Sequence, residues 1–243
     1  MSQSLQVQEL IIVIAVKQQN PTILTADFLK YTGIVPSDWE LARPPVLTNS
    51  AAQVAFQNGI NIVAEPNRVI FSQDIANIEP QEVQIPAIAR KYAETLTQVN
   101  YQGVGINFRG LVFDEQENNT TRNYILENLL QPGKFQEFGT AGVKASIRFT
   151  YILEETQLYL DINEAELQYP DKKVPAVLFS ASFNHGFAQK DQSQLLTAIK
   201  KVINNWQADL ETYKELINTK FLNQDSYIRT APTEATQLLI GTI

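Results

Sequence analysis

The chain has 243 residues, of which 44% are hydrophobic and 19% are charged. This length and composition suit one large globular domain or two small halves, with ample apolar material for a core. The formal net charge is −7 at pH 7, and no run of clustered lysine and arginine interrupts the sequence. Because phosphate backbones and anionic lipid surfaces attract clustered positive charge, we expect neither nucleic acid nor a membrane as a partner.

The absence of cysteine excludes disulfides, thiolate nucleophiles and cysteine-based metal sites. The first five residues lack the basic region of a signal peptide. The apolar run at residues 10–16 is far shorter than the roughly 18 residues that a bilayer-spanning helix needs. We therefore expect a cytoplasmic protein.

The first half of the chain predicts a sheet followed by a helix. Residues 10–16 are almost continuously apolar, which is typical of a central strand buried on both faces. A short helix is predicted at 25–31, with Thr25 as its N-terminal cap. The dipeptide Asn58-Gly59 predicts a β-hairpin, because the central residues of such a turn need positive φ. The other elements expected here are a strand at 68–72, an amphipathic helix at 85–99 and a strand at 103–113.

The second half contains the clearest pattern, at residues 143–221. Alternating apolar residues predict three strands, over 143–153, 158–162 and 177–183. A single helix of about 28 residues follows, long enough to cover a whole sheet at about 42 Å. Its apolar residues recur at spacings of three and four, which places Trp206 in the core. A short helix at 122–130 and an apolar tail at 235–243, either an edge strand or a docking segment, complete this half.

The two halves resemble each other. Val69 and Val177 lie 108 positions apart, and each lies in the last of three strands that precede an amphipathic helix. We interpret the chain as an α+β fold of mainly antiparallel sheet, built from two βββα-like pseudo-repeats with helices packed on one face. This gives a single domain of two similar halves, at about 1–113 and 114–222, with a tail at 223–243. Chance similarity between two amphipathic helices is the alternative to duplication.

No residue pattern predicts catalysis, a metal site or a cofactor. His185 is the only histidine, and although histidine suits general-base chemistry, no serine, cysteine or aspartate accompanies it in a recognisable arrangement. The acidic clusters at 114–117, 154–155 and 161–166 lack the spacing of a calcium loop, and they are predicted to lie on solvated edges. Gly103-x-Gly105 lacks the third glycine of a dinucleotide-binding motif.

Arginines at the borders of apolar stretches are the best candidates for contacts with a ligand or partner. Such an arginine can hold a carboxylate or phosphate, or it can pair with a nearby acidic residue. Arg109 is the leading candidate because it lies in the middle of a predicted strand, where its charge must be paired or exposed. The full set of candidate contacts is Arg109, Arg43, Tyr151, His185 and Trp39.

We expect a non-enzymatic interaction or assembly protein, which forms a homo-oligomer such as a dimer or binds a protein partner. The reasons are the lack of a catalytic constellation, a sheet face that the helices leave uncovered, and the apolar tail. The alternative is a small-molecule binding module with a cavity between the sheet and the helical stripe at 195–217, lined by Arg109 or Tyr151. A third alternative is an enzyme whose acid/base chemistry comes from carboxylates or tyrosine, with His185 as a further candidate.

Overall fold

The computed structural model describes residues 5–113, 124–140, 143–154, 156–187 and 192–222. The strands are β1 Gln6–Val16, β2 Val46–Leu47, β3 Ala52–Ala55, β4 Asn61–Glu65, β5 Arg68–Asp74, β6 Tyr101–Phe113, β7 Ile147–Ile152, β8 Gln157–Gln168 and β9 Lys173–Gly186. They form one nine-stranded sheet in the spatial order β2-β3-β4-β5-β1-β6-β9-β8-β7, and every pairing is antiparallel. The prediction of an α+β fold with a mainly antiparallel sheet is confirmed.

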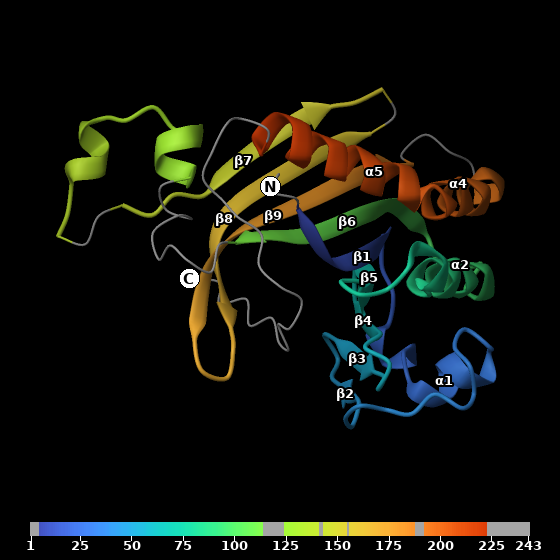
Figure 1. Cartoon of the computed structure of the whole chain (residues 1–243). Coiled ribbons are helices and arrows are strands. Elements are labelled where there is room, and N and C mark those ends of the chain that lie inside the picture. The colour runs from blue at the N-terminus through green and yellow to red at the C-terminus, as the bar shows by residue number, and fades with distance from the viewer. Residues whose placement is uncertain (1–4, 114–123, 141–142, 155, 188–191, 223–243) are drawn as a thin grey trace.

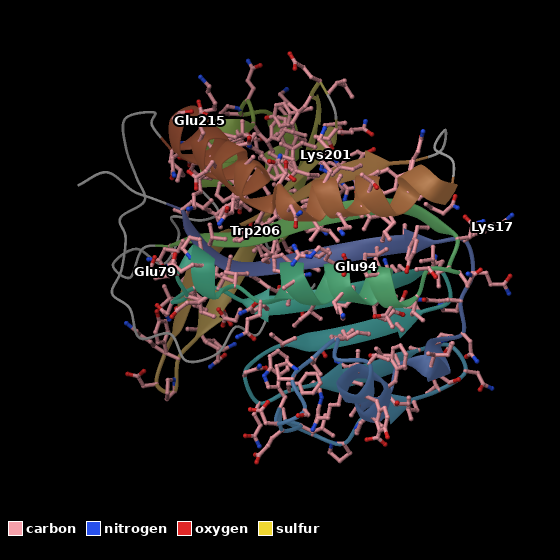
Figure 2. The ribbon with its side chains drawn as sticks, turned by 90° about the vertical axis from the view of Figure 1, so that its right-hand side faces the viewer. Lys17, Glu79, Glu94, Lys201, Trp206 and Glu215 are labelled. Atoms are coloured by element: carbon pink, nitrogen blue, oxygen red, sulfur yellow. The ribbon has the colours of Figure 1, made fainter. Side chains whose placement is uncertain are left out.

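The helices are α1 Ala26–Tyr31, α2 Ile85–Thr95, α4 Gln192–Asn204 and α5 Trp206–Leu216. Short 3-10 turns lie at Pro21–Ile23, Pro80–Glu82 and Lys134–Glu137, and π-helical turns at Tyr124–Leu129 and Ile217–Phe221. Figures 1 and 2 show α2, α4 and α5 side by side on one side of the sheet. Within the described ranges, no α-helix covers the opposite side. None of these helices is long and apolar enough to span a bilayer.

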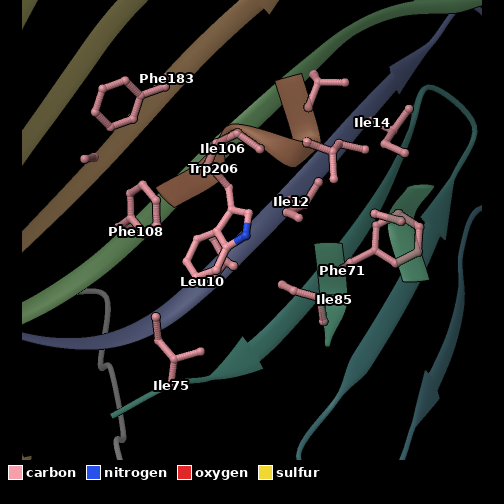
Figure 3. Packing of buried hydrophobic residues seen from close by; sticks show 14 of the residues in the cluster. Leu10, Ile12, Ile14, Phe71, Ile75, Ile85, Ile106, Phe108, Phe183 and Trp206 are labelled. Carbon is pink, nitrogen blue, oxygen red and sulfur yellow. The ribbon is translucent and has the colours of Figure 1, made fainter. Parts of the chain in front are cut away.

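The main core lies between the sheet and this helix layer, and a smaller cluster that includes Leu111, Phe113 and Leu178 is buried on the other face at one end of β6 and β9. The central strands β1 and β6 pair with Leu10 opposite Phe108 and Ile12 opposite Ile106. All four side chains are fully buried, and Figure 3 shows them beneath Trp206 of α5. Because side chains alternate along a strand, the intervening residues point to the other face of the sheet.

The strand β1 meets one expectation and departs from another. It lies in the middle of the sheet, between β5 and β6, as its continuous apolar sequence predicted. Its second face is not fully buried, however, since Ile11, Val13 and Ala15 are only half-buried. The apolar run therefore serves the core on one face and forms a partly exposed apolar surface on the other.

The long helix that we predicted after the last strand is interrupted. It is divided at Asn205 into α4 and α5, and the π-helical turn Ile217–Phe221 ends it. Two consecutive asparagines, Asn204 and Asn205, favour such an interruption because their side chains compete for backbone hydrogen bonds. The apolar side of α4 and α5, which we call the apolar seam, nevertheless packs on the sheet, since Trp206 is 6% exposed and Tyr213 is fully buried.

Several smaller elements occur where the sequence predicted them. Gly59 adopts φ 83 in the hairpin between β3 and β4. Thr25 caps α1, and its Oγ1 accepts a hydrogen bond from the N–H of Phe28 at 3.0 Å. The helix expected at 122–130 is a π-helical turn instead. The apolar tail at 235–243 and the acidic cluster at 114–117 lie outside the described residues.

Candidate functional site

The structure does not bring the five candidate residues together. Arg109 points to the face of the sheet opposite the helices, whereas His185 lies near the end of β9 and points toward the helices. Tyr151 lies on edge strand β7 and stacks on Phe149, with ring centroids 6.2 Å apart. The predicted residues thus fall on separate surfaces.

The remaining two candidates lie in the segment between α1 and β2. Trp39 is half-buried and packs edge-to-face on Phe56, with ring centroids 5.2 Å apart. Arg43 is exposed. These contacts give Trp39 a packing role, and neither residue lines a pocket with His185 or Arg109 in the described part of the chain.

A pocket of about 560 Å³ lies beside His185, where α4 and α5 meet at Asn205. We call it the α4–α5 pocket. Its apolar wall comes from Phe187, Ala198 and Val202. Its polar lining comes from β9 and from one side of the two helices, namely His185, Gln194, Thr197, Lys201, Asn205 and Asp209. The pocket is thus amphipathic, as small-molecule sites commonly are.

A histidine and a carboxylate lie at the base of the α4–α5 pocket. The Nε2 atom of His185 is 3.4 Å from Oδ2 of Asp209, and the two side chains are only 16% and 12% exposed. Asp209 and Gln73 are the polar residues that the described part of the chain buries most deeply. Gln73 is well satisfied, because its Oε1 accepts the N–H groups of Gln84 and Ile85 at the start of α2. Asp209 has only the long contact to His185 among the described residues.

The sequence singles out His185 but not Asp209. The apolar spacing at 195–217 leaves Asp209 on the polar side of the predicted helix, together with lysine and glutamate residues that are mostly exposed in the structure. A signal was available, because Asp209 follows Trp206 by three positions and precedes Tyr213 by four. Residues at those spacings share one side of a helix, and both aromatic neighbours are buried.

The face of the sheet opposite the helices is the second candidate surface. We call it the open face, and it comprises the outward side chains of β4, β5, β1, β6, β9, β8 and β7. At its centre Nη1 of Arg109 lies 3.0 Å from Oε2 of Glu9, across the β1–β6 pair. Two further ion pairs lie on this face, each with an N–O distance of 2.7 Å: Arg68–Glu65 and Arg148–Asp161. Each of these three arginines pairs with a nearby acidic residue.

The pH dependence of stability should reveal the burial of Glu9. Burial raises the pKa of Glu9, because desolvation outweighs the attraction of Arg109. A carboxyl with a raised folded-state pKa contributes stability that is lost as the pH rises through that pKa. Compared with the parent, Glu9→Gln should therefore become progressively more stable as the pH rises above 4.5, the ordinary pKa of a glutamate. Urea unfolding followed by circular dichroism measures this difference.

A matched control with the opposite sign is available on α2. A hydrogen bond from Lys200 lowers the pKa of Glu94. Its contribution to stability is therefore present above the unfolded-state pKa and lost as the pH falls. Compared with the parent, Glu94→Gln should therefore become less stable as the pH rises toward 4.5, the ordinary pKa of a glutamate, which is below the range in which Glu9→Gln gains. Parallel pH profiles for the two variants would contradict the assignment.

The chemistry of these surfaces points to binding. Within the described residues, no group of three or more histidine, aspartate and glutamate side chains is placed to hold a metal ion. The α4–α5 pocket offers a carboxylate, an imidazole, amide groups and the ammonium group of Lys201, which suit recognition of a polar group by hydrogen bonds. The chain matches no protein-family model, and no curated protein matches it. The geometry of the two surfaces therefore carries the functional argument.

Proposed function

We propose that the protein is a non-enzymatic interaction protein that self-associates through its open face. The observation that carries this proposal is the one-sided helix layer, which leaves the other face of a large sheet uncovered by any described helix (Figure 1). Across that face Val63, Ile70 and Val13 lie opposite one another on adjacent strands β4, β5 and β1. These three side chains are half-buried in the single chain, and exposed apolar patches larger than a few hundred Å² mark protein interfaces.

The charges of the open face support a second copy of the same chain as the partner. The whole chain carries a net charge of −7, which opposes association of two copies. The open face instead carries its arginines as neutral ion pairs. In a two-fold dimer the same patch occurs on both subunits. The apolar row formed by Val63, Ile70 and Val13 of one copy would therefore pack on the same row of the other copy.

The strands beside the apolar row also support close approach of a partner. Outward positions of β6 and β9 hold small residues, among them Gly103, Gly105 and Ser182. Together with Arg68 and Asn107 they line a hollow of about 370 Å³. Side chains of a partner could fill this hollow while the apolar row excludes water.

Substitution at the centre of the apolar row tests the proposal. Val13→Glu places a charge between Ile70 and Gly105 on the open face, and it should convert a dimer into a monomer. Size-exclusion chromatography with light scattering, over a range of protein concentrations, measures the mass directly. We expect the dissociation constant to rise by at least about tenfold, which corresponds to about 1.4 kcal/mol.

A matched control lies on the edge of the same sheet. Leu47 of edge strand β2 is 51% exposed and lies outside the open face, and Leu47→Glu should leave the mass unchanged. Loss of the dimer in Leu47→Glu alone would assign association to the sheet edge. Loss of the dimer after deletion of 235–243, with Val13→Glu still dimeric, would assign it to the tail. A parent protein that is monomeric at all concentrations would end the proposal.

We also propose that the fold arose by duplication of a βββα-like unit, so that the domain consists of two similar halves. The supporting observation is the symmetric strand order, in which β3-β4-β5-β1 on one side corresponds to β7-β8-β9-β6 on the other. In each half a long strand comes first, a three-stranded antiparallel run follows, and a helix closes the unit. On this reading β6 opens the second half, so the boundary lies near residue 100 instead of 113.

Small-molecule binding is a second candidate function, favoured by the α4–α5 pocket. The pocket lies beside the apolar seam at the helix junction, and neither Arg109 nor Tyr151 lines it. Its lining differs in this respect from the cavity that the sequence led us to expect. The pocket and the open face are on opposite sides of the sheet, so the two functions are compatible.

A further inference from the structure

We propose that the α4–α5 pocket binds a small molecule that carries a protonated amine on an apolar body. This inference concerns the helix side of the sheet and does not depend on self-association. It rests on three features of the pocket: a buried carboxylate at its base, an imidazole that lies beside one oxygen of that carboxylate, and an apolar wall of suitable size.

The carboxylate of Asp209 selects for a cationic, hydrogen-bond-donating group. Burial of a carboxylate is unfavourable unless a positive charge or several hydrogen bonds compensate it. In the described part of the chain, Oδ2 of Asp209 has only the 3.4 Å contact to His185, and no described hydrogen bond reaches Oδ1. An ammonium group would supply both a positive charge and N–H donors at this position.

His185 lies beside one oxygen of the carboxylate. Its Nε2 atom faces Oδ2 of Asp209, so an N–H at that position would donate to this oxygen and leave Oδ1 for a ligand. His185 belongs to the end of β9, where its backbone pairs with Val104 of β6, and Asp209 belongs to α5. The sheet and the helix thus set the relative positions of the imidazole and the carboxylate.

The wall of the pocket suits an apolar body attached to that amine. Phe187 is buried, and Ala198 and Val202 are half-buried along one side of α4. The volume of about 560 Å³ lies within the range of roughly 300–1,000 Å³ that small-molecule sites occupy.

Three probes of similar shape and different charge test the proposal with the full-length chain. Phenethylamine is the cation, 2-phenylethanol the neutral analogue and 3-phenylpropionate the anion. We expect phenethylamine to bind with a dissociation constant on the order of 1 mM, as fragments of this size do. The other two should bind at least about tenfold more weakly. Titration followed by amide chemical shifts in two-dimensional NMR measures the affinities and locates the site.

Variants identify the carboxylate that is responsible. Asp209→Asn should weaken phenethylamine binding at least about tenfold, because it removes the charge and keeps the shape. The control is Asp161→Asn, which removes a carboxylate from the open face and should leave the affinity unchanged. If Asp209→Asn does not fold, Thr197→Trp decides the question, since Thr197 is an exposed residue of the pocket lining and a larger side chain would block it.

Three outcomes would overturn the proposal. The first is equal binding of phenethylamine and 2-phenylethanol, because the charge would then play no part. The second is equal weakening by Asp161→Asn and Asp209→Asn, which would indicate general attraction of cations to the acidic surface. The third is full binding in a folded Asp209→Asn or in Thr197→Trp. Loss of the dimer in Val13→Glu with phenethylamine binding intact would separate this site from the proposed function.

Discussion

Alanine in place of Trp206 is expected to lower the free energy of unfolding by about 3–5 kcal/mol. Trp206 is the first residue of α5, and its side chain is only 6% exposed. Figure 3 shows the indole over β1 and β6, close to Leu10 and Phe108, which are fully buried. The residues around it belong to the central strands of the sheet, so they cannot move in to fill the space that the indole leaves. Urea unfolding followed by circular dichroism measures the loss.

The neighbouring residue provides the control for this prediction. Gln207 is exposed on the same turn of α5, and Gln207→Ala should change the free energy of unfolding by no more than about 0.5 kcal/mol. An equally small effect of Trp206→Ala would show that α5 is not anchored by its apolar seam. The packing of the helix layer on the sheet would then need another explanation.

The strands were predictable because their sequence pattern is local. Alternation of apolar and polar residues identified β7, β8 and β9, and the apolar run at 10–16 identified a central strand. The lengths were less predictable, since β8 and β9 extend beyond the alternating residues to Gln168 and Gly186. Continued pairing with a neighbouring strand maintains these extensions, and a single-strand pattern contains no information about its neighbour.

The interruption at Asn205 shows the limit of the helical pattern. The apolar periodicity from Leu195 to Ile217 is strong enough to predict one helix, and it continues across the junction. The low helix propensity of two asparagines is a difference of only about 0.5 kcal/mol per residue, which a pattern of seven apolar residues outweighs. The structure keeps the apolar seam but interrupts the helix at Asn205. Asn205 lies in the lining of the α4–α5 pocket.

Functional contacts were predictable as residue types but not as pairs. The chemistry of Arg109 required a partner or exposure, and its partner Glu9 lies 100 positions away in the sequence. Their meeting follows from the pairing of β1 with β6, which no local pattern reveals. The same holds for His185 and Asp209, since only the packing of α5 over the end of β9 brings them together.

The second large effect is expected at Gly110, where alanine should cost about 2–4 kcal/mol. A Cβ atom at this position of β6 would lie 2.7 Å from the hydroxyl oxygen of Tyr213 and 2.7 Å from Cδ1 of Leu5. The end of the Leu5 side chain can move, but the tyrosine cannot move freely. Its ring is fully buried, and its hydroxyl donates a hydrogen bond to the carbonyl of Phe179 at 2.7 Å. Alanine must therefore displace α5 or break this bond.

A second glycine in the same strand gives the matched control. Gly105 points to the open face, where a Cβ atom would find its nearest neighbours at 3.4 Å, an ordinary contact. Because glycine in a strand is intrinsically unfavourable by roughly 0.5–1 kcal/mol, Gly105→Ala should be neutral or slightly stabilising. If the Tyr213 hydroxyl is the obstacle, Gly110→Ala should cost less in a Tyr213→Phe background than in the parent. Equal costs in both backgrounds would place the obstacle at Leu5. An effect of Gly110→Ala as small as that of Gly105→Ala would show that neither face of β6 is closely packed at these positions.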